Sequence, residues 1–340
     1  MDIGALRGGS YRSQREIYDE RYTAGHYDNR SAIHVLTAER EALAGALDRA
    51  LKSNPGVEAI NVFDFGYGSG RVTNELACAF PLDYAAAGKN LRIVAFDVSS
   101  VGLMKAREAL CALGFSPEDD QEWRGDEVGG RILGGVSKNN EAGLTVSVVF
   151  AHGREDQDPE LMYKLALRAS SDEPYLVTTS WYSGLGHIPG RSLRHEYFRQ
   201  LGALTSANGE IVLSVSSTGD LVEIQPEWER RRLSGDVGGF PIEEPGDLVY
   251  LTELGQENFY HVFGTDLNVH MAAITAQGQH WWVQGIRCPD PEFESLTEEQ
   301  DNYWRVFKAN ESKRGRQWDA ADYSEFHTVA AFRSPADPVR

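Results

Sequence analysis

Two hydrophobic patterns alternate along this chain: short continuous apolar runs, and longer segments with an apolar residue every three or four positions. Continuous runs are typical of strands buried on both faces, and the spaced segments are typical of helices with one buried side. The alternation predicts an α/β fold in which a doubly wound, mostly parallel sheet is covered by helices. The first five predicted strands are residues 59–65, 89–97, 144–151, 175–181 and 210–216.

Two further strands late in the chain, residues 279–287 and 324–333, would complete a seven-stranded sheet. Ser99 suits the N-cap of the helix that follows the second strand. Gly209 suits a left-handed stop for the helix before the fifth strand. The predicted helices are residues 38–51, 71–80, 99–113, 159–169, 193–204 and 266–276.

Residues 116–143 interrupt the alternation, because this stretch is rich in Asp, Glu, Gly and Asn. We expect an inserted loop with a short hairpin near residues 131–136, and the composition fits a lid as well as plain surface. A second insertion, residues 223–263, carries several aromatic residues.

The first predicted strand ends in a glycine-rich turn, Asp64-Phe65-Gly66-Tyr67-Gly68-Ser69-Gly70, and a helical segment follows. In a doubly wound sheet this arrangement directs backbone N–H groups and a helix N-terminus at a ligand above the strand ends. A nicotinamide dinucleotide fingerprint has its third glycine five residues after the first, where this chain has Arg71. The turn therefore argues against a dinucleotide site.

The second predicted strand ends in an acid, Asp97, whose two carboxylate oxygens suit the adjacent hydroxyls of a ribose. Its distance along the chain from Gly66 exceeds the ~20 residues of the usual fingerprint. Residues 81–90 add a loop that accounts for the excess.

The spacing Asp64-x-Gly66-x-Gly68-x-Gly70 resembles the first motif of class I S-adenosylmethionine-dependent methyltransferases of the small-molecule type. The resemblance extends motif by motif over about residues 64–209 and by order of elements beyond them. It implies a Rossmann-like sheet whose last strand is antiparallel, S-adenosyl-L-methionine as cofactor, and methyl transfer to an O, N or C nucleophile of a small molecule, with secondary metabolism as one setting.

In that family the glycines let the backbone approach the methionine part of the cofactor, and a tyrosine of an N-terminal lid helix closes over it. Tyr18 and Tyr22 share one face of such a helix here. Arg154 stands where the family has an acid near the adenine, which leaves Asp156 as the candidate. The implied cofactor-binding residues are Asp64, Gly66, Tyr67, Gly68, Gly70, Asp97, Val98, Asp156, Ser180 and Tyr22.

Residues 182–189 resemble the family's fourth motif, in which a His-Ile-Pro triplet borders the transferred methyl group. His187 and Tyr182 are the candidate catalytic residues. His187 would act either as a general base or as a structural group that caps the next helix, and both interpretations stay open. The candidate substrate-binding residues, which would line the pocket or fill the core, are Trp181, Tyr27, Trp228 and Tyr260.

Three alternatives to methyl transfer remain. The same fold transfers the aminocarboxypropyl group of S-adenosylmethionine in other enzymes, and the bulk of Tyr67 within the turn is the feature that would reposition the cofactor. A nicotinamide oxidoreductase is disfavoured by Arg71. A nucleoside-binding protein without catalysis is not excluded by any residue.

The amino-acid composition argues against several classes of binding partner. The formal net charge of −18 argues against nucleic acid, and the chain has neither a run of ~18 apolar residues nor the apolar core of a signal peptide. The three cysteines, at positions 78, 111 and 288, form no Cys-x-x-Cys pair, and no spacing suggests a metal site. We expect a cytoplasmic protein with a small-molecule substrate and no membrane partner; a homodimer is compatible with the sequence.

The chain divides into four predicted parts. They are an N-terminal helical lid (1–56), a cofactor-binding core (57–222), a substrate-chamber elaboration (223–265) and a C-terminal helix with the last strands of the core (266–340).

Overall fold

The structure is a computed structural model, and the elements described below come from part of the chain. The described residues are 14–25, 33–74, 76–78, 88–118, 123–124, 130–139, 143–153, 158–171, 173–181, 184–216, 240, 242–243, 246–251, 257–261, 263, 282–287 and 327–333. The predicted helix at residues 266–276 lies outside them.

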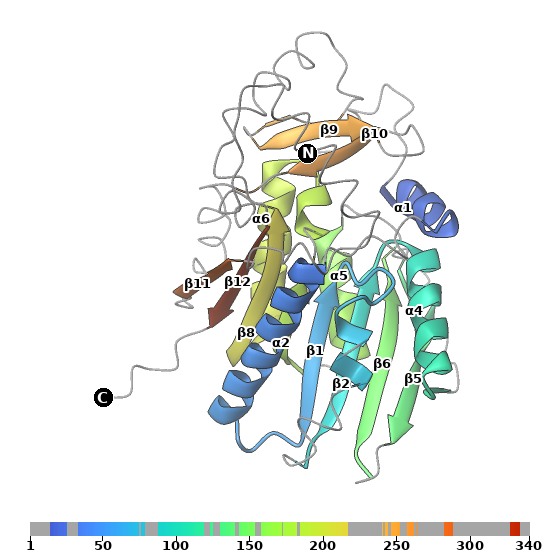
Figure 1. Ribbon diagram of the computed structural model, residues 1–340, viewed down its shortest axis with the longest axis vertical. Helices are drawn as coiled ribbons and strands as arrows, with labels where there is room; N and C mark the ends of the chain where they lie inside the picture. The colour runs from blue at the N-terminus through green and yellow to red at the C-terminus, as the bar shows by residue number, and fades with distance from the viewer. Residues whose placement is uncertain are drawn as a thin grey trace.

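The centre of the molecule is a block of parallel strands that lie side by side in the order β6-β2-β1-β7-β8 (Figure 1). Their bounds are β1 (Ala59–Phe65), β2 (Asn90–Asp97), β6 (Thr145–His152), β7 (Tyr175–Ser180) and β8 (Thr205–Ser216). From β1 the chain proceeds outward through β2 to β6, and it then crosses back to β7 on the other side of β1. This change of direction is the topological switch point, where ligands bind in doubly wound sheets.

Two late strands continue the sheet beyond β8. The strand β12 (His327–Arg333) pairs antiparallel with β8, and β11 (Trp282–Arg287) pairs antiparallel with β12. The order β11-β12-β8-β7-β1-β2-β6 therefore confirms the predicted sheet, including its antiparallel last strand.

The insertion at residues 116–143 builds sheet rather than only a loop. The strand β5 (Arg131–Asn139) pairs antiparallel with β6, and two short strands, β3 (Ser116–Pro117) and β4 (Trp123–Arg124), pair with β5. The expected hairpin near residues 131–136 is thus part of a longer strand that lies between β6 and the short strands β3 and β4. Its composition did not show this, because an antiparallel strand can have few apolar positions.

Helices cover both faces of the sheet, as the continuous apolar strands require. On one face lie α2 (Ile33–Ser53), α4 (Ser100–Ala112) and the helical residues that follow the glycine turn. On the other lie α5 (Pro159–Ala169) and α6 (Arg191–Leu204). Among the described helices, none has the length and apolar character to cross a bilayer.

The helix α2 was predicted within an N-terminal lid, but it is a layer of the core. Its residues Leu43, Ala46, Leu47 and Ala50 are buried against the sheet. Leu43 and Leu47, which are spaced four residues apart as a helix requires, are part of the stripe that α2 buries. Of the two described N-terminal helices, α1 (Gln14–Thr23) is the one that lies over the strand ends. The four-part division of the chain otherwise stays a prediction.

Gly209 is not a left-handed helix stop. The helix α6 ends at Leu204, and Thr205 is already extended, while Gly209 is absent from the described glycines with positive φ. The β7–β8 register shifts just before this point, and a Cβ on Gly209 would lie 2.7 Å from the carbonyl oxygen of Leu176. Glycine is needed here for close approach of two backbones.

A fork of two hydrogen bonds attaches α2 to the sheet. The Nε and Nη2 atoms of Arg49 donate to the two carboxylate oxygens of Glu210 at 3.0 and 2.7 Å. Glu210 is buried in β8, whereas about a third of the Arg49 side chain is exposed.

We predict that Arg49→Met destabilises the fold more than Glu210→Gln does. Removing the arginine leaves a buried carboxylate without a counter-ion, at about 3–5 kcal/mol. Removing the acid leaves a guanidinium that can turn into water, at about 1 kcal/mol. Urea unfolding of both variants measures the difference. Lys52→Met, which breaks the exposed pair with Asp48, is the control and should change little; equal losses in the first two variants would contradict the prediction.

Candidate functional site

The glycine turn adopts a backbone path that side chains disfavour. Gly66, Gly68 and Gly70 have φ angles of 73°, 56° and 77°, which lie in the left-handed region. The N–H groups of Gly66 and Tyr67 both donate to the carbonyl oxygen of Phe96, at 2.9 and 3.0 Å. The turn after β1 is therefore folded over the end of β2.

Asp97 joins the turn to the next helix. Its Oδ2 accepts from the N–H of Gly68 and its Oδ1 from the N–H of Ser99, both at 2.7 Å. The side chain is buried, and this burial raises the pKa of Asp97 to about 6. Each carboxylate oxygen keeps a second lone pair, so the group can hold the turn and still accept from two hydroxyls.

Two adjacent residues at the end of β7 each have a buried side-chain polar atom without a hydrogen-bond partner among the described residues. They are Ser180, through Oγ, and Trp181, through Nε1. At the end of β1, Oδ1 of Asp64 also has no close partner, although the hydroxyl of the neighbouring Thr179 faces the same carboxylate. Asp64 pairs with Thr179 and Phe65 with Ser180 in the β1–β7 register, so Asp64 and Ser180 point to opposite faces of the sheet at the switch point. Buried polar atoms are nearly always satisfied in folded proteins, so these atoms are candidates for contact with a ligand or ordered water.

The other carboxylate oxygen of Asp64 is engaged, since it accepts from the hydroxyl of Thr73 at the start of the following helix. Burial raises the pKa of Asp64 to about 7. The acid at the end of β1 is therefore tied to the first turn of the helix that follows the glycines.

Tyr67 directs its side chain into the core. Its hydroxyl donates to the side-chain oxygen of Asn74, and its ring lies edge-on to Phe150 at 6.3 Å between centroids. The side chain is buried. Tyr67 can therefore face a ligand only through its backbone.

The helix α1 lies across the turn and the start of α4. Oδ1 of Asp19 accepts from the hydroxyl of Ser99 at 2.6 Å and from the N–H of Val101 at 3.4 Å. The hydroxyl of Tyr22 lies so close to Gly68 that a Cβ on this glycine would be 2.1 Å away from it. Figure 1 shows α1 beside the upper end of α4.

His187 connects three segments. It ends a 3₁₀ helix, η3 (Gly184–His187), and its Nδ1 lies 3.0 Å from the carbonyl oxygen of Phe259 in β10 (Glu257–His261). A carbonyl oxygen only accepts, so Nδ1 carries the proton and Nε2 is an acceptor. The ring contacts Tyr260 at 4.8 Å and the edge of Tyr18 at 5.4 Å between centroids.

Burial is the main cause that lowers the pKa of His187 to about 3, and the nearby Arg21 lowers it further. The imidazole is therefore neutral at physiological pH. The antiparallel hairpin of β9 (Asp247–Leu251) and β10 lies above the same end of the sheet as η3 and α1 (Figure 1).

The structure brings most of the predicted site residues to one end of the sheet. Val98 lies beside Asp97, and its carbonyl oxygen accepts from Nε2 of His152 at 3.1 Å. Sequence reasoning did not assign Asp19 or His152, whose contacts depend on distant segments; Tyr18 was marked only by sharing a helix face with Tyr22. Four predicted residues lie outside the described part of the chain: Tyr27, Asp156, Tyr182 and Trp228.

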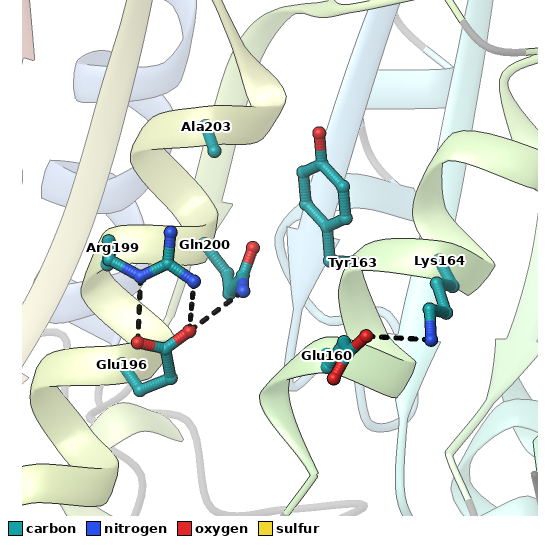
Figure 2. A pocket seen from close by; sticks show the side chains of 7 residues that line it. All are labelled: Glu160, Tyr163, Lys164, Glu196, Arg199, Gln200 and Ala203. Carbon is teal, nitrogen blue, oxygen red and sulfur yellow. Dashed lines mark hydrogen bonds and ion pairs between the residues drawn. The ribbon is translucent and has the colours of Figure 1, made fainter. Parts of the chain in front are cut away.

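A second concave region lies between α5 and α6, on the outer side of the helices. Its charged side chains pair along their own helix, Glu160 with Lys164 and Glu196 with Arg199. Figure 2 shows Tyr163 and Gln200 between these two pairs. The cleft offers no unpaired charge, and the strand ends remain the candidate site. No cluster of three metal-ligating side chains occurs in the described part of the chain.

No protein-family model matches this chain, and no curated protein matches it in sequence. Solved structures with a similar backbone include the CcbJ methyltransferase from Streptomyces caelestis, with 16% identity, a TM-score of 0.40, and coverage of 88% of this chain and 90% of that one. An S-adenosylmethionine-dependent methyltransferase from Clostridium acetobutylicum has 10% identity, a TM-score of 0.44 and coverage of 94% and 97%. One from Methanosarcina mazei has 12% identity, a TM-score of 0.41 and coverage of 84% and 96%. Similarity at this level concerns the path of the backbone, so the chemistry of the site has to be argued from its own residues.

We predict that Gly68→Ala is destabilising and that part of the loss disappears in a Tyr22→Leu background. The methyl group would meet the Tyr22 hydroxyl, whereas the left-handed φ costs roughly 1 kcal/mol in either background. A double-mutant cycle by urea unfolding measures the coupling, expected at about 1 kcal/mol or more. Gly88→Ala is the control, because Gly88 has a φ of 64° and open space around it. Additive losses at positions 22 and 68 would show that Tyr22 does not lie against the turn.

We further predict that Asp64→Asn gains stability over the wild type as the pH rises. With its folded pKa raised to about 7 from 3.8, Asp64 stabilises the fold fully below about pH 3.8 and loses that contribution as the pH rises through 7. The variant lacks this loss, so its advantage should grow by on the order of 1–3 kcal/mol between about pH 5 and 8.

Urea unfolding at several pH values measures this difference. Burial lowers the pKa values of His152 and His187, so these residues change the stability with pH in the opposite direction. Their contribution is the same in the variant and the wild type, and it cancels in the difference. Asp48→Asn, at an exposed position of α2, is the control and should show no such trend. A pH-independent difference for Asp64→Asn would mean that this acid is ionised at neutral pH.

Proposed function

We propose that this chain binds S-adenosyl-L-methionine at the glycine turn and transfers its methyl group to an O, N or C nucleophile of a small molecule. The proposal rests on one observation, which is that two features lie together at the switch point of the sheet. The buried carboxylate of Asp97 holds the turn with lone pairs to spare, and polar atoms of Ser180 and Trp181 at the end of β7 have no hydrogen-bond partner among the described residues.

These groups fit the two ends of the cofactor. Asp97 would accept from the ribose hydroxyls. An amino-acid head group has both N–H donors and carboxylate acceptors, and it would meet an acceptor in Asp64, a hydroxyl in Ser180 and a donor in Trp181. A dinucleotide fits less well, because Arg71, in place of the third glycine, forms a buried ion pair with Glu39 of α2.

The protein's contribution to methyl transfer would be alignment and exclusion of water. When bound, S-adenosylmethionine supplies a methyl group that its sulfonium already activates. Holding a nucleophile in line with such a group is worth ~7–11 kcal/mol in favourable cases. Tyr18, His187 and Tyr260 come from three segments that meet at the strand ends, and we place the acceptor beside them.

We assign His187 an orienting role in preference to that of a general base. Its Nδ1–H is committed to Phe259, and its pKa of about 3 makes Nε2 a weak base at neutral pH. Nε2 can still accept a hydrogen bond from the nucleophile. Aminocarboxypropyl transfer has no support from Tyr67, whose ring is in the core. The acidic composition argues against a nucleic-acid acceptor, and a small-molecule acceptor and a cytoplasmic location are part of the proposal.

The proposal predicts that the purified protein binds S-adenosylhomocysteine and that Asp97→Asn weakens this binding about 10- to 100-fold. The loss corresponds to a charged hydrogen bond of ~1.5–3 kcal/mol. Isothermal titration calorimetry measures both affinities, and NAD serves as the competing ligand. Asp158→Asn, at the N-cap of α5, is the control. A wild type that binds NAD but not S-adenosylhomocysteine would overturn the proposed function, whereas unchanged affinity in Asp97→Asn would remove only Asp97 from the ribose contact.

A further inference from the structure

A buried ionic cluster lies directly behind His187. It consists of Arg194 in α6, Asp247 at the start of β9 and His261 at the end of β10, and each of the three side chains is fully buried. Burying charges is costly unless they are paired and hydrogen-bonded. The segments of the chain that these three side chains join therefore indicate what the cluster does.

Arg194 bridges two segments with the two arms of its guanidinium. Nη1 donates to the carbonyl oxygen of Ile188, the residue after His187, at 2.9 Å, and Nη2 donates to Oδ1 of Asp247, also at 2.9 Å. A lysine ammonium is a compact point charge without this planar fork. The bridge therefore depends on arginine and not only on positive charge.

Asp247 closes the hairpin side of the cluster. Its Oδ1 also accepts from Nδ1 of His261 at 2.7 Å, and its Oδ2 accepts from the N–H of Glu243 at 2.9 Å. Asp247 and His261 are partners in the β9–β10 register. The side chain of Glu243 in turn accepts from the N–H of Arg191 at 2.7 Å, which ties the segment before β9 to the start of α6.

The cluster brackets the contact between His187 and β10 on both sides. Phe259 and Tyr260, which bind and contact His187, immediately precede His261 on the same strand. Ile188, the acceptor of Arg194, immediately follows His187. We infer that Arg194, Asp247 and His261 are positioning residues that hold the His187 loop and the β9–β10 hairpin as one unit, which forms the acceptor side of the site.

Arg194, Asp247 and His261 are called the clamp below. The inference rests on the proposed function only where it names the acceptor side of the site, because the clamp is defined by its contacts alone. Its readout is the state of the His187 ring. Among the described residues, the charged and titratable groups that face this ring are Arg21 and Tyr18 of α1 and Tyr260 of β10. While the clamp holds, Phe259 keeps the proton on Nδ1 and the ring stays neutral.

The test is a long-range ¹H–¹⁵N correlation spectrum of histidine-labelled protein at about pH 7 and about pH 5.5. In the wild type we expect His187 to be the neutral Nδ1–H tautomer at both pH values. Arg194→Lys keeps a positive charge and His261→Asn keeps a hydrogen-bond donor in place. In both variants we expect the His187 ring to show the Nε2–H tautomer at about pH 7 and to take up a proton at about pH 5.5. The reason is that an exposed imidazole has a pKa of ~6.5.

Glu210→Gln is the matched control, because it also breaks an arginine–carboxylate pair with a buried acid, but one between α2 and β8. It should lower the melting temperature and leave the His187 signals unchanged. Clamp variants that melt lower and yet keep the wild-type His187 spectrum would overturn the inference, since the cluster would then be merely structural. Should a clamp variant fail to fold, native-state hydrogen exchange of the wild type decides: the hairpin and the His187 loop must open together, and separate opening overturns the clamp.

Calorimetry with S-adenosylhomocysteine on the same samples separates this inference from the proposed function. Arg194→Lys should bind it with an affinity within about threefold of the wild type, because the clamp does not touch Asp97 or the glycine turn. A wild type that does not bind it would refute the proposed function and leave the His187 result standing.

Discussion

One buried carboxylate holds the centre of this molecule together. Asp97 accepts from the backbone of the glycine turn with one oxygen and from the backbone before α4 with the other. The two N–H groups come from segments that strands β1 and β2 bring side by side. Without the acid, two buried donors would lose their partner at the place where the chain makes its tightest turn. The position of the turn, and of any ligand above it, depends on this interaction.

The closing elements are arranged around the same end of the sheet, and each uses a different kind of contact. The helix α1 is attached through Asp19 at the N-terminus of α4, where the helix dipole and free N–H groups favour an acid. The loop at His187 is attached to the hairpin by a backbone carbonyl. Aromatic contacts from Tyr18 and Tyr260 fill the space between them. Three segments far apart in sequence thus form one wall.

Burial shifts the pKa values of the titratable residues at this end of the sheet, and the residue types alone do not reveal these shifts. Asp64 and Asp97 hold protons to higher pH than exposed acids, whereas His152 and His187 lose theirs at lower pH. All four shifts have the same main cause, which is that a buried site disfavours the charged form. The buried acids of the site therefore titrate closer to neutral pH than exposed acids do, whereas its two buried histidines are uncharged at neutral pH.

The sequence by itself determined the central sheet, because continuous apolar runs and the glycine spacing are local signals that no distant residue has to complete. Strand β1 and helix α5 have the predicted bounds, and Ser99 caps α4 as its position suggested. The antiparallel strand β5 was harder to predict, since its pairing with β6 comes from backbone hydrogen bonds that composition does not encode.

Only the tertiary structure decided which side chains point into the core and which distant residues are in contact. It turned Tyr67 into the core, made α2 a core layer, and gave Gly209 a role in close packing. It also brought Asp19 to Ser99 and joined Arg194 to Asp247 and His261. These contacts join residues that are far apart along the chain, and their energy depends on burial and on exact distances. Neither quantity exists until the chain has folded, so a pattern of residue types specifies the scaffold and leaves the closing contacts of the site undetermined.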